Sequence, residues 1–332
     1  MKIRRISLLF IAAALAGVVG CAGLNSIGGP TIGDTGPLVP GIASYVVADM
    51  YDGHIVMALG AEVRRPVASL TKIATAVATL EFISSAGIDA GEIMTVPPQV
   101  QLLGNPGVAQ LQPGEMLSIR DGLAAAMIGS DNFAAETLAL HVGGKLAAAG
   151  VNGNPMAAFI NQMNGLSSRA GLRDTRFANA HGLELPNQRG YSTAADLARL
   201  TAYALKVPGF SYYSSQPSRT ISVRGGGGAR SVNIRNTNEL LGRGGIDGVK
   251  TGTTTLAGPC LALSASRPAT VIKRADGSTV VIPHRLIIVE LGASDRFNQG
   301  WTLLQQGWST YDAWRNSGSV PGPSLFAQAP AQ

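Results

Sequence analysis

The sequence predicts an α+β protein in which an antiparallel sheet carries an inserted helical lobe. Strand-like segments stand near both ends of the chain, at residues 43–59 and 261–289, and helix-like segments occupy the middle. This order favours an antiparallel sheet with the helices grouped together against it. The 332 residues are 45% hydrophobic and 14% charged, so the chain can bury a large core and does not have the composition of a disordered protein.

The first strands form a hairpin pattern, and four helical segments follow. Residues 43–50 and 55–59 flank a Tyr-Asp-Gly turn. Pro66 then precedes the first helical segment, as is common at helix starts. The helical segments share apolar residues at helical spacing, and they lie at 67–83, 121–142, 156–170 and 193–205.

The second half of the chain returns to strands. Residues 220–223 and 231–234 flank four glycines and predict a hairpin with a loose tip. Three further strand-like runs lie at 261–266, 271–274 and 280–289, with Asp276-Gly277 as a hairpin turn. The segment Arg267–Pro283 is longer than expected, and we interpret it as a lengthened hairpin. A helix over 295–314 closes the fold.

Residues 1–20 have the pattern of an export signal. Lys2, Arg4 and Arg5 precede an apolar stretch that is shorter than the roughly 20 residues of a membrane span. The stretch ends at Cys21 after Val-Val-Gly, which resembles a bacterial lipobox. We therefore expect a lipoprotein signal peptide, lipidation of Cys21, and an exported protein anchored to a membrane and facing the periplasm or cell wall. The alternative is a soluble secreted protein with an incidental cysteine.

Composition also divides the rest of the chain. Residues 21–41 are rich in Gly, Pro and Thr and predict a flexible tether, and 317–332 predict a disordered tail. The part between them, 42–316, is expected to be one catalytic domain of two lobes.

Charge and metal-binding patterns exclude some classes of function. Removing Lys2, Arg4 and Arg5 from the 26 basic residues leaves 23 against 20 acidic ones, a net charge of +3. That balance, with 5% aromatic residues, does not suggest a nucleic-acid partner. The four histidines show no ligand spacing, so we expect no metal and no cofactor. Cys260 lies in an apolar run and is expected to be a buried structural thiol.

Three short motifs carry the chemistry. They occur in the order Ser69-Leu70-Thr71-Lys72, Ser130-Asp131-Asn132 and Lys250-Thr251-Gly252. Each alone has an ordinary alternative, such as an exposed helix pair, a helix cap or a loop. Together and in this order they are typical of serine acyl-transfer sites.

The spacing of the first motif suits a nucleophile and its base. Ser69 and Lys72 are three residues apart near a helix start, so their side chains share one face. A serine hydroxyl needs an adjacent base, and a lysine can be that base if its pKa is lowered. We expect a site shielded from water, with Lys250 as a second cation, to lower it. The helix N-terminus favours negative charge developing at Ser69.

The motifs and their surroundings resemble the serine D-alanyl-D-alanine carboxypeptidases, the low-molecular-mass penicillin-binding proteins. The likeness runs from about Ala43 to Trp308. Beyond the three motifs it rests on Phe177–Leu183, Tyr191–Leu197, Asn236–Asn238, Gly245–Gly248 and Leu286–Gly292.

The resemblance implies roles in acyl transfer. Ser69 is the residue to be acylated, and Lys72 is its general base. Ser130 passes the proton to the leaving D-alanine, and Asn132 hydrogen-bonds the substrate amide. The expected substrate is a peptidoglycan stem peptide ending in D-Ala-D-Ala, and β-lactams are expected covalent inhibitors at the same serine.

The resemblance also implies how the substrate's terminal carboxylate is held. Lys250 supplies positive potential, and Thr251 binds the carboxylate with the help of Arg296. Gly252 lets a substrate backbone approach an edge strand closely. The backbone N–H groups of Ser69 and Thr253 form the oxyanion hole.

Two other functions stay open. Ser-Asp-Asn is more typical of class A β-lactamases than of carboxypeptidases, and those enzymes need a deacylating glutamate. The nearest candidate, Glu184, lies in the carboxypeptidase-like stretch and is interpreted as a loop residue. A penicillin adduct is therefore expected to be released slowly.

The third hypothesis is a catalytically silent wall-binding or penicillin-sensing lipoprotein. Endopeptidase action on D-Ala cross-links is a variant of the first, and His181 is expected to be a structural hydrogen-bonding residue.

Overall fold

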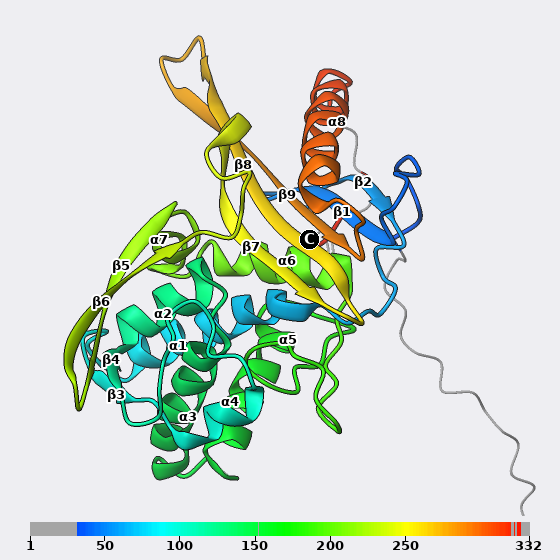
Figure 1. The fold of residues 1–332 in the computed structure, drawn as a ribbon. Coiled ribbons are helices and arrows are strands. Elements are labelled where there is room, and N and C mark those ends of the chain that lie inside the picture. Colours follow the sequence, from blue (N-terminus) through cyan, green and yellow to red (C-terminus); the bar gives the residue numbers. More distant parts are fainter. Residues whose placement is uncertain (1–31, 152, 320–321, 323, 327–332) are drawn as a thin grey trace, which may run out of the picture. The chain divides into compact units, whose positions relative to one another are not determined.

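The computed structural model describes residues 32–151, 153–319, 322 and 324–326. Its centre is a five-stranded antiparallel sheet in the order β2-β1-β9-β8-β7 (Figure 1). Both ends of the chain contribute to this sheet, so the predicted α+β class with an inserted helical lobe is confirmed. The strands are β1 (Ser44–Asp49), β2 (Ile55–Leu59), β7 (Ile246–Thr254), β8 (Gly258–Lys273) and β9 (Thr279–Leu291).

The helical lobe lies between β2 and β7 in the sequence. Its central element is α1, which buries Ile73, Val77 and most of its other residues against the surrounding helices. The helices of the lobe are α1 (Thr71–Ser85), α2 (Ile119–Ile128), α3 (Asn132–Ala148), α4 (Pro155–Asn164), α5 (Leu166–Arg169), α6 (Ala194–Ala204) and α7 (Phe210–Ser214). Short 3-10 turns are η1 (Ala68–Leu70), η2 (Pro98–Leu103) and η3 (Arg243–Gly245).

Helix α8 (Arg296–Asn316) covers the opposite face of the sheet (Figure 1). Successive side chains of a strand point to opposite faces, and β9 shows this directly. Ile287 and Val289 belong to the core shared with the helical lobe, whereas Leu286 and Ile288 belong to the core under α8. The sheet is thus buried on both faces, which explains its continuous apolar runs.

The segment predicted as one helix over 121–142 is two helices. Helix α2 ends at Ile128, and Ser130 takes a left-handed backbone conformation with φ of 58°. The Asp131 carboxylate then caps α3 by accepting the N–H of Ala134 at 2.9 Å. The predicted helix over 156–170 is likewise divided into α4 and α5.

A second, smaller sheet has the order β3-β4-β5-β6. The sequence predicted only the hairpin of β5 (Ser218–Gly225) and β6 (Gly228–Arg235). Strands β3 (Ile93–Thr95) and β4 (Met116–Ser118) have three residues each, too few for a recognisable alternation.

The predicted runs 261–266 and 271–274 join into the single long strand β8. Beyond Arg267 the β8–β9 hairpin extends past the neighbouring strands and projects from the sheet (Figure 1). Val271 and Val281 face each other across it and are 58% and 60% exposed. The extra segment therefore lengthens a hairpin, as the sequence suggested.

The ordered part of the chain is wider than predicted. Ile32 lies in the lobe core, and the N–H groups of Thr35 and Gly36 donate to the carbonyl of Ala58. Leu325 is 1% exposed, and its N–H donates to Gly53. The predicted tether over 21–41 and the predicted disordered tail are thus wrong for residues 32–41 and 324–326, because apolar side chains there find places in the core. The predicted signal peptide and Cys21 lie outside the described residues.

Within the described ranges, no helix is both long and apolar enough to span a membrane.

Candidate active site

The start of α1 brings Ser69 and Lys72 together. Ser69 lies in the 3-10 turn η1, and Lys72 lies in the first turn of α1. Ala68, just before the serine, has a positive φ of 48°, a strained conformation that is found most often at functional sites. The Nζ atom of Lys72 lies 2.9 Å from the Oγ atom of Ser69. This is hydrogen-bond distance for a nucleophile and its base.

Lys72 is buried and held by three acceptors. Its Nζ donates to Ser69 Oγ, to Asn132 Oδ1 at 2.7 Å and to the main-chain carbonyl of His181 at 2.9 Å. Burial lowers the pKa of Lys72 to about 7, while the Asp131 carboxylate acts in the opposite direction. The sequence pointed to Lys250 as a cause, but burial accounts for the lowered pKa. Near neutral pH an appreciable fraction of Lys72 is therefore an unprotonated base.

The middle motif forms the sharp link between α2 and α3. The left-handed backbone of Ser130 places Asn132 at the first position of α3, where its Oδ1 reaches Lys72. Asp131 is buried and also accepts the N–H of Ala109 at 2.9 Å. The carboxylate thus joins a distant loop to the helix start. The Ser130 hydroxyl forms no hydrogen bond with the described residues.

The third motif lies on β7, which is an edge strand of the large sheet. Lys250 is buried, and its Nζ donates to the carbonyl of Thr251 at 3.0 Å. Its pKa is lowered by burial first, and then by the charges of Lys72 and Arg296. Protonation of the Lys72 and Lys250 amines at the same time is therefore disfavoured, because both are buried and their charges repel. The Thr251 hydroxyl meets the Thr237 hydroxyl at 2.6 Å.

Gly252 packs closely against the start of α1, which the sequence did not predict. A Cβ atom at this position would lie 2.9 Å from the main-chain nitrogen of Ser69 and 3.2 Å from that of Leu70. The glycine therefore allows β7 to approach the start of α1, in addition to any approach by substrate. This contact places the Ser69 N–H beside the strand that carries Thr253, where the oxyanion hole is expected.

Arg296 reaches the site from the start of α8. Its Nη1 donates to the carbonyl of Gly252 at 2.7 Å and to the Thr253 hydroxyl at 2.6 Å. The structure therefore brings Arg296 to the end of β7, beside Thr251 and Thr253, instead of leaving it as a free helix-start residue. Its guanidinium brings a positive charge to this end of β7.

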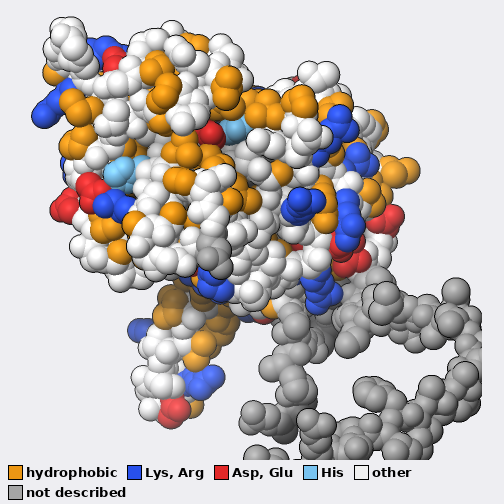
Figure 2. Space-filling model, turned by 90° about the horizontal axis from the view of Figure 1, so that it is seen from below, with side chains coloured by type: hydrophobic (Ala, Val, Ile, Leu, Met, Phe, Trp, Pro, Cys, Tyr) orange, Lys and Arg blue, Asp and Glu red, His pale blue; other side chains and the backbone are white. Residues whose placement is uncertain are grey.

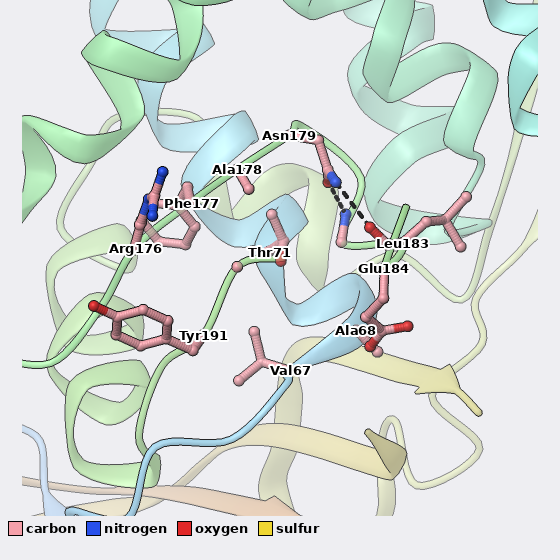
Figure 3. A pocket seen from close by; sticks show the side chains of 12 residues that line it. Val67, Ala68, Thr71, Arg176, Phe177, Ala178, Asn179, Leu183, Glu184 and Tyr191 are labelled. Atoms are coloured by element: carbon pink, nitrogen blue, oxygen red, sulfur yellow. Dashed lines mark hydrogen bonds between the residues drawn. The ribbon is translucent and has the colours of Figure 1, made fainter. Parts of the chain in front are cut away.

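A turn formed by residues 179–184 lies beside the start of α1, where Ala68 and Thr71 line the same pocket (Figure 3). The Asn179 side chain bridges it, accepting the N–H of Gly182 and donating to the carbonyl of Leu183. Glu184, at one end of the pocket in Figure 3, accepts the Thr254 hydroxyl at 2.6 Å, while Arg176 and Tyr191 line the other end. Glu184 is thus a loop residue tied to β7.

His181 is buried in this turn as a neutral ring. Burial, reinforced by Lys72, lowers its pKa to about 3. Its Nδ1 accepts the N–H of Leu183 at 3.1 Å, and its carbonyl accepts from Lys72. These contacts give His181 a structural hydrogen-bonding role at the site.

Three further features concern the Cys260 thiol, possible metal ligands and the distribution of charge on the surface. Cys260 is buried, and desolvation raises the pKa of its thiol to about 11. Within the described ranges no three His, Cys, Asp or Glu side chains are placed to hold a metal ion. On the face in Figure 2, basic side chains are interspersed with acidic, apolar and uncharged ones.

Sequence reasoning missed three features of the site. The His181 carbonyl and the Glu184–Thr254 contact depend on a loop fold that no local pattern specifies. Thr237 lies in a stretch that the sequence analysis quoted, but its contact with Thr251 was not foreseen.

Comparison with known proteins agrees with this geometry. The family model of Peptidase S11, described as D-alanyl-D-alanine carboxypeptidase, matches residues 40–279. The D-alanyl-D-alanine carboxypeptidase DacC of Escherichia coli strain K12 is 30% identical over 280 residues, which cover 81% of this chain and 62% of the relative. This chain therefore spans about three fifths of that relative's length.

Two further comparisons cover more of the related protein. A D-alanyl-D-alanine endopeptidase of Pseudomonas aeruginosa is 30% identical over 242 residues, covering 72% of this chain and 70% of the relative. Penicillin-binding protein D2 of Listeria monocytogenes, solved in an ampicillin-bound form, is 26% identical with a TM-score of 0.65, covering 82% of this chain and 100% of that one. The chain belongs to the Peptidase S11 family of D-alanyl-D-alanine carboxypeptidases.

Proposed function

We propose that this protein is a serine D-Ala-D-Ala carboxypeptidase that removes the terminal D-alanine of peptidoglycan stem peptides. The observation that carries the proposal is the buried Lys72 amine, 2.9 Å from the Ser69 hydroxyl and 2.7 Å from Asn132. A lysine with a pKa lowered to about 7 can accept the serine proton near neutral pH. The family assignment supports the same reaction.

The proposed reaction has two steps. Lys72 takes the Ser69 proton as Oγ attacks the carbonyl carbon of the penultimate D-alanine, and the oxyanion is stabilised by the N–H groups of Ser69 and Thr253. The peptide C–N bond then breaks as Ser130 gives its proton to the leaving D-alanine nitrogen and takes the proton held by Lys72, so Lys72 is neutral again. Water, deprotonated by the same base, cleaves the ester and regenerates the Ser69 hydroxyl.

Substrate recognition is proposed at the electropositive end of β7. The terminal carboxylate would meet the Thr251 hydroxyl and the Arg296 guanidinium, with Lys250 behind them. The substrate backbone would run along the open edge of β7 as an added strand. Penicillins would acylate Ser69 in the same place, and their adduct would be released slowly. The ampicillin-bound form of the Listeria neighbour supports a β-lactam-accessible site.

The test is release of D-alanine from diacetyl-Lys-D-Ala-D-Ala in the wild type, Ser69→Ala and Ser84→Ala. Ser84 lies exposed near the end of α1 and serves as a matched serine control. We expect release in the wild type and the control, and none in Ser69→Ala. Rapid penicillin destruction with the peptide untouched would instead indicate a β-lactamase-like enzyme.

Two other outcomes are informative. Cleavage of a D-Ala cross-linked dimer with the monomer untouched would move the assignment to an endopeptidase, as the Pseudomonas relative is named. No reaction with either substrate would leave the wall-binding or penicillin-sensing function.

We also propose that the chain is exported and anchored through a lipid on Cys21. The support is the basic and apolar start of the sequence followed by Val-Val-Gly-Cys. Metabolic labelling with radioactive palmitate should label the wild type and not Cys21→Ser. Equal labelling of the two would reject the anchor.

A further inference from the structure

Glu136 is an acidic side chain on the inner face of α3 that the proposed reaction does not use. It lies four residues after Asn132, and therefore on the same side of the helix, toward Lys72. Its side chain is 14% exposed and forms no hydrogen bond with the described residues. Burial raises the pKa of Glu136 to about 7. Burial of an ionised carboxyl lowers the stability of the folded protein unless another group interacts with it.

Glu136 lies close to the ring of His181, although outside hydrogen-bond distance. The Oε2 atom of Glu136 lies 3.7 Å from the Nε2 atom of His181. The other ring nitrogen, Nδ1, accepts the N–H of Leu183, so it carries no proton. Because the ring is neutral, its one proton is on Nε2, the ring nitrogen that lies 3.7 Å from Glu136.

The same histidine holds the catalytic amine. The main-chain carbonyl of His181 accepts from Lys72 at 2.9 Å, so it is one of the three groups that fix the amine beside Ser69. The ring and the carbonyl belong to one tight turn, whose neighbour Gly182 packs so closely that a Cβ would lie 1.9 Å from the carbonyl oxygen of Ala68. We therefore expect a change in the ring position to strain this turn and weaken the contact of its carbonyl with Lys72.

We propose that Glu136 is a positioning residue for Lys72. Its carboxyl attracts the Nε2–H group of the His181 ring, and through the His181 carbonyl this attraction helps hold the Lys72 amine against the Ser69 hydroxyl. This inference rests on the proposed function only in that Ser69 must be acylated. It assigns Glu136 no contact with substrate.

The test compares Glu136→Leu and Glu136→Gln in the full-length chain. The readouts are the second-order rate of Ser69 acylation by a fluorescent penicillin, and kcat and KM for the peptide. Leucine removes the carboxyl that lies beside the His181 Nε2–H group, and we expect acylation and kcat to fall about tenfold. KM should change less than twofold, because β7 and Arg296 hold the carboxylate. Glutamine keeps an oxygen in place and should recover most of the rate.

The matched control is Glu92→Leu. Glu92 contacts His141, which lies on α3 like Glu136, at 2.7 Å and away from the catalytic groups. Loss of this contact should lower thermal stability without slowing acylation. If Glu136→Leu does not fold, Glu136→Asp is used instead. It withdraws the carboxyl by one methylene and should show a smaller fall in the rate of Ser69 acylation.

Three results would overturn the inference. Glu136→Leu could acylate at the wild-type rate, Glu136→Gln could be as slow as Glu136→Leu, or the loss could appear in KM instead of kcat. A wild type that is not acylated at all would instead reject the proposed function, so the two failures are distinguishable.

Discussion

The rate of Ser69 acylation should depend on pH through the protonation of Lys72. Burial places the pKa of Lys72 at about 7, so the amine is mostly charged at pH 5.5 and mostly neutral at pH 8.5. The neutral fraction rises from roughly 3% to roughly 97% over this range. If only the neutral amine can accept the serine proton, the rate should rise about thirtyfold.

Asp131→Asn should shift this profile. The Asp131 carboxylate raises the pKa of Lys72, against the larger effect of burial. Without the carboxylate the amine should lose its proton at lower pH, so the midpoint should move in the acidic direction. Asp312→Asn, an exposed change on α8, should leave the midpoint where it is.

Stopped-flow mixing with a fluorescent penicillin measures the second-order acylation rate across this pH range. Two results would refute the reasoning: a rate that is flat between pH 5.5 and 8.5, or a midpoint that moves to higher pH in Asp131→Asn. The first would mean that Lys72 is not the base, and the second that its charge environment is misassigned.

Three further predictions concern packing, charge and recognition. Glu290 is buried with both carboxylate oxygens unpartnered within the described residues, and burial raises its pKa to about 9. Stability should therefore fall as pH rises above about 4.5, by at most about 1.4 kcal/mol per unit. Glu290→Gln should remove that slope, so its advantage in melting temperature should grow from pH 5 to pH 8; an advantage that stays constant argues against this. Gly252→Ala should slow acylation at least tenfold, because its Cβ would meet the Ser69 nitrogen at 2.9 Å; a wild-type rate would contradict this account of the glycine. Arg296→Leu should raise KM for the peptide more than it lowers kcat, and steady-state kinetics showing the reverse split would remove Arg296 from carboxylate binding.

The approach of Ser69 to Lys72 could be predicted from the sequence because a short spacing fixes it. Ser69 and Lys72 are brought together by one helical turn, and the Lys-Thr-Gly run marks the edge strand beside them. These positions depend on local geometry, which the sequence pattern describes directly.

The parts that could not be predicted depend on tertiary contacts. The sequence predicted one helix over 121–142, and only the left-handed Ser130 shows that the first helix ends there. Residues 32–41 look like a linker, yet Ile32 fills a place in the core. Lys72 and His181 lie far apart in the sequence. Their contact uses the main-chain carbonyl of His181, which every type of residue has, so no sequence pattern predicts it.

The central claim is that Ser69 forms the acyl-enzyme. It is tested most directly by incubating the full-length chain with a penicillin, digesting it, and mapping the added mass to a peptide. We predict one adduct, on the peptide containing Ser69, that is absent from Ser69→Ala and persists after free penicillin is removed. An adduct on another residue, or an unchanged adduct in Ser69→Ala, would contradict the account.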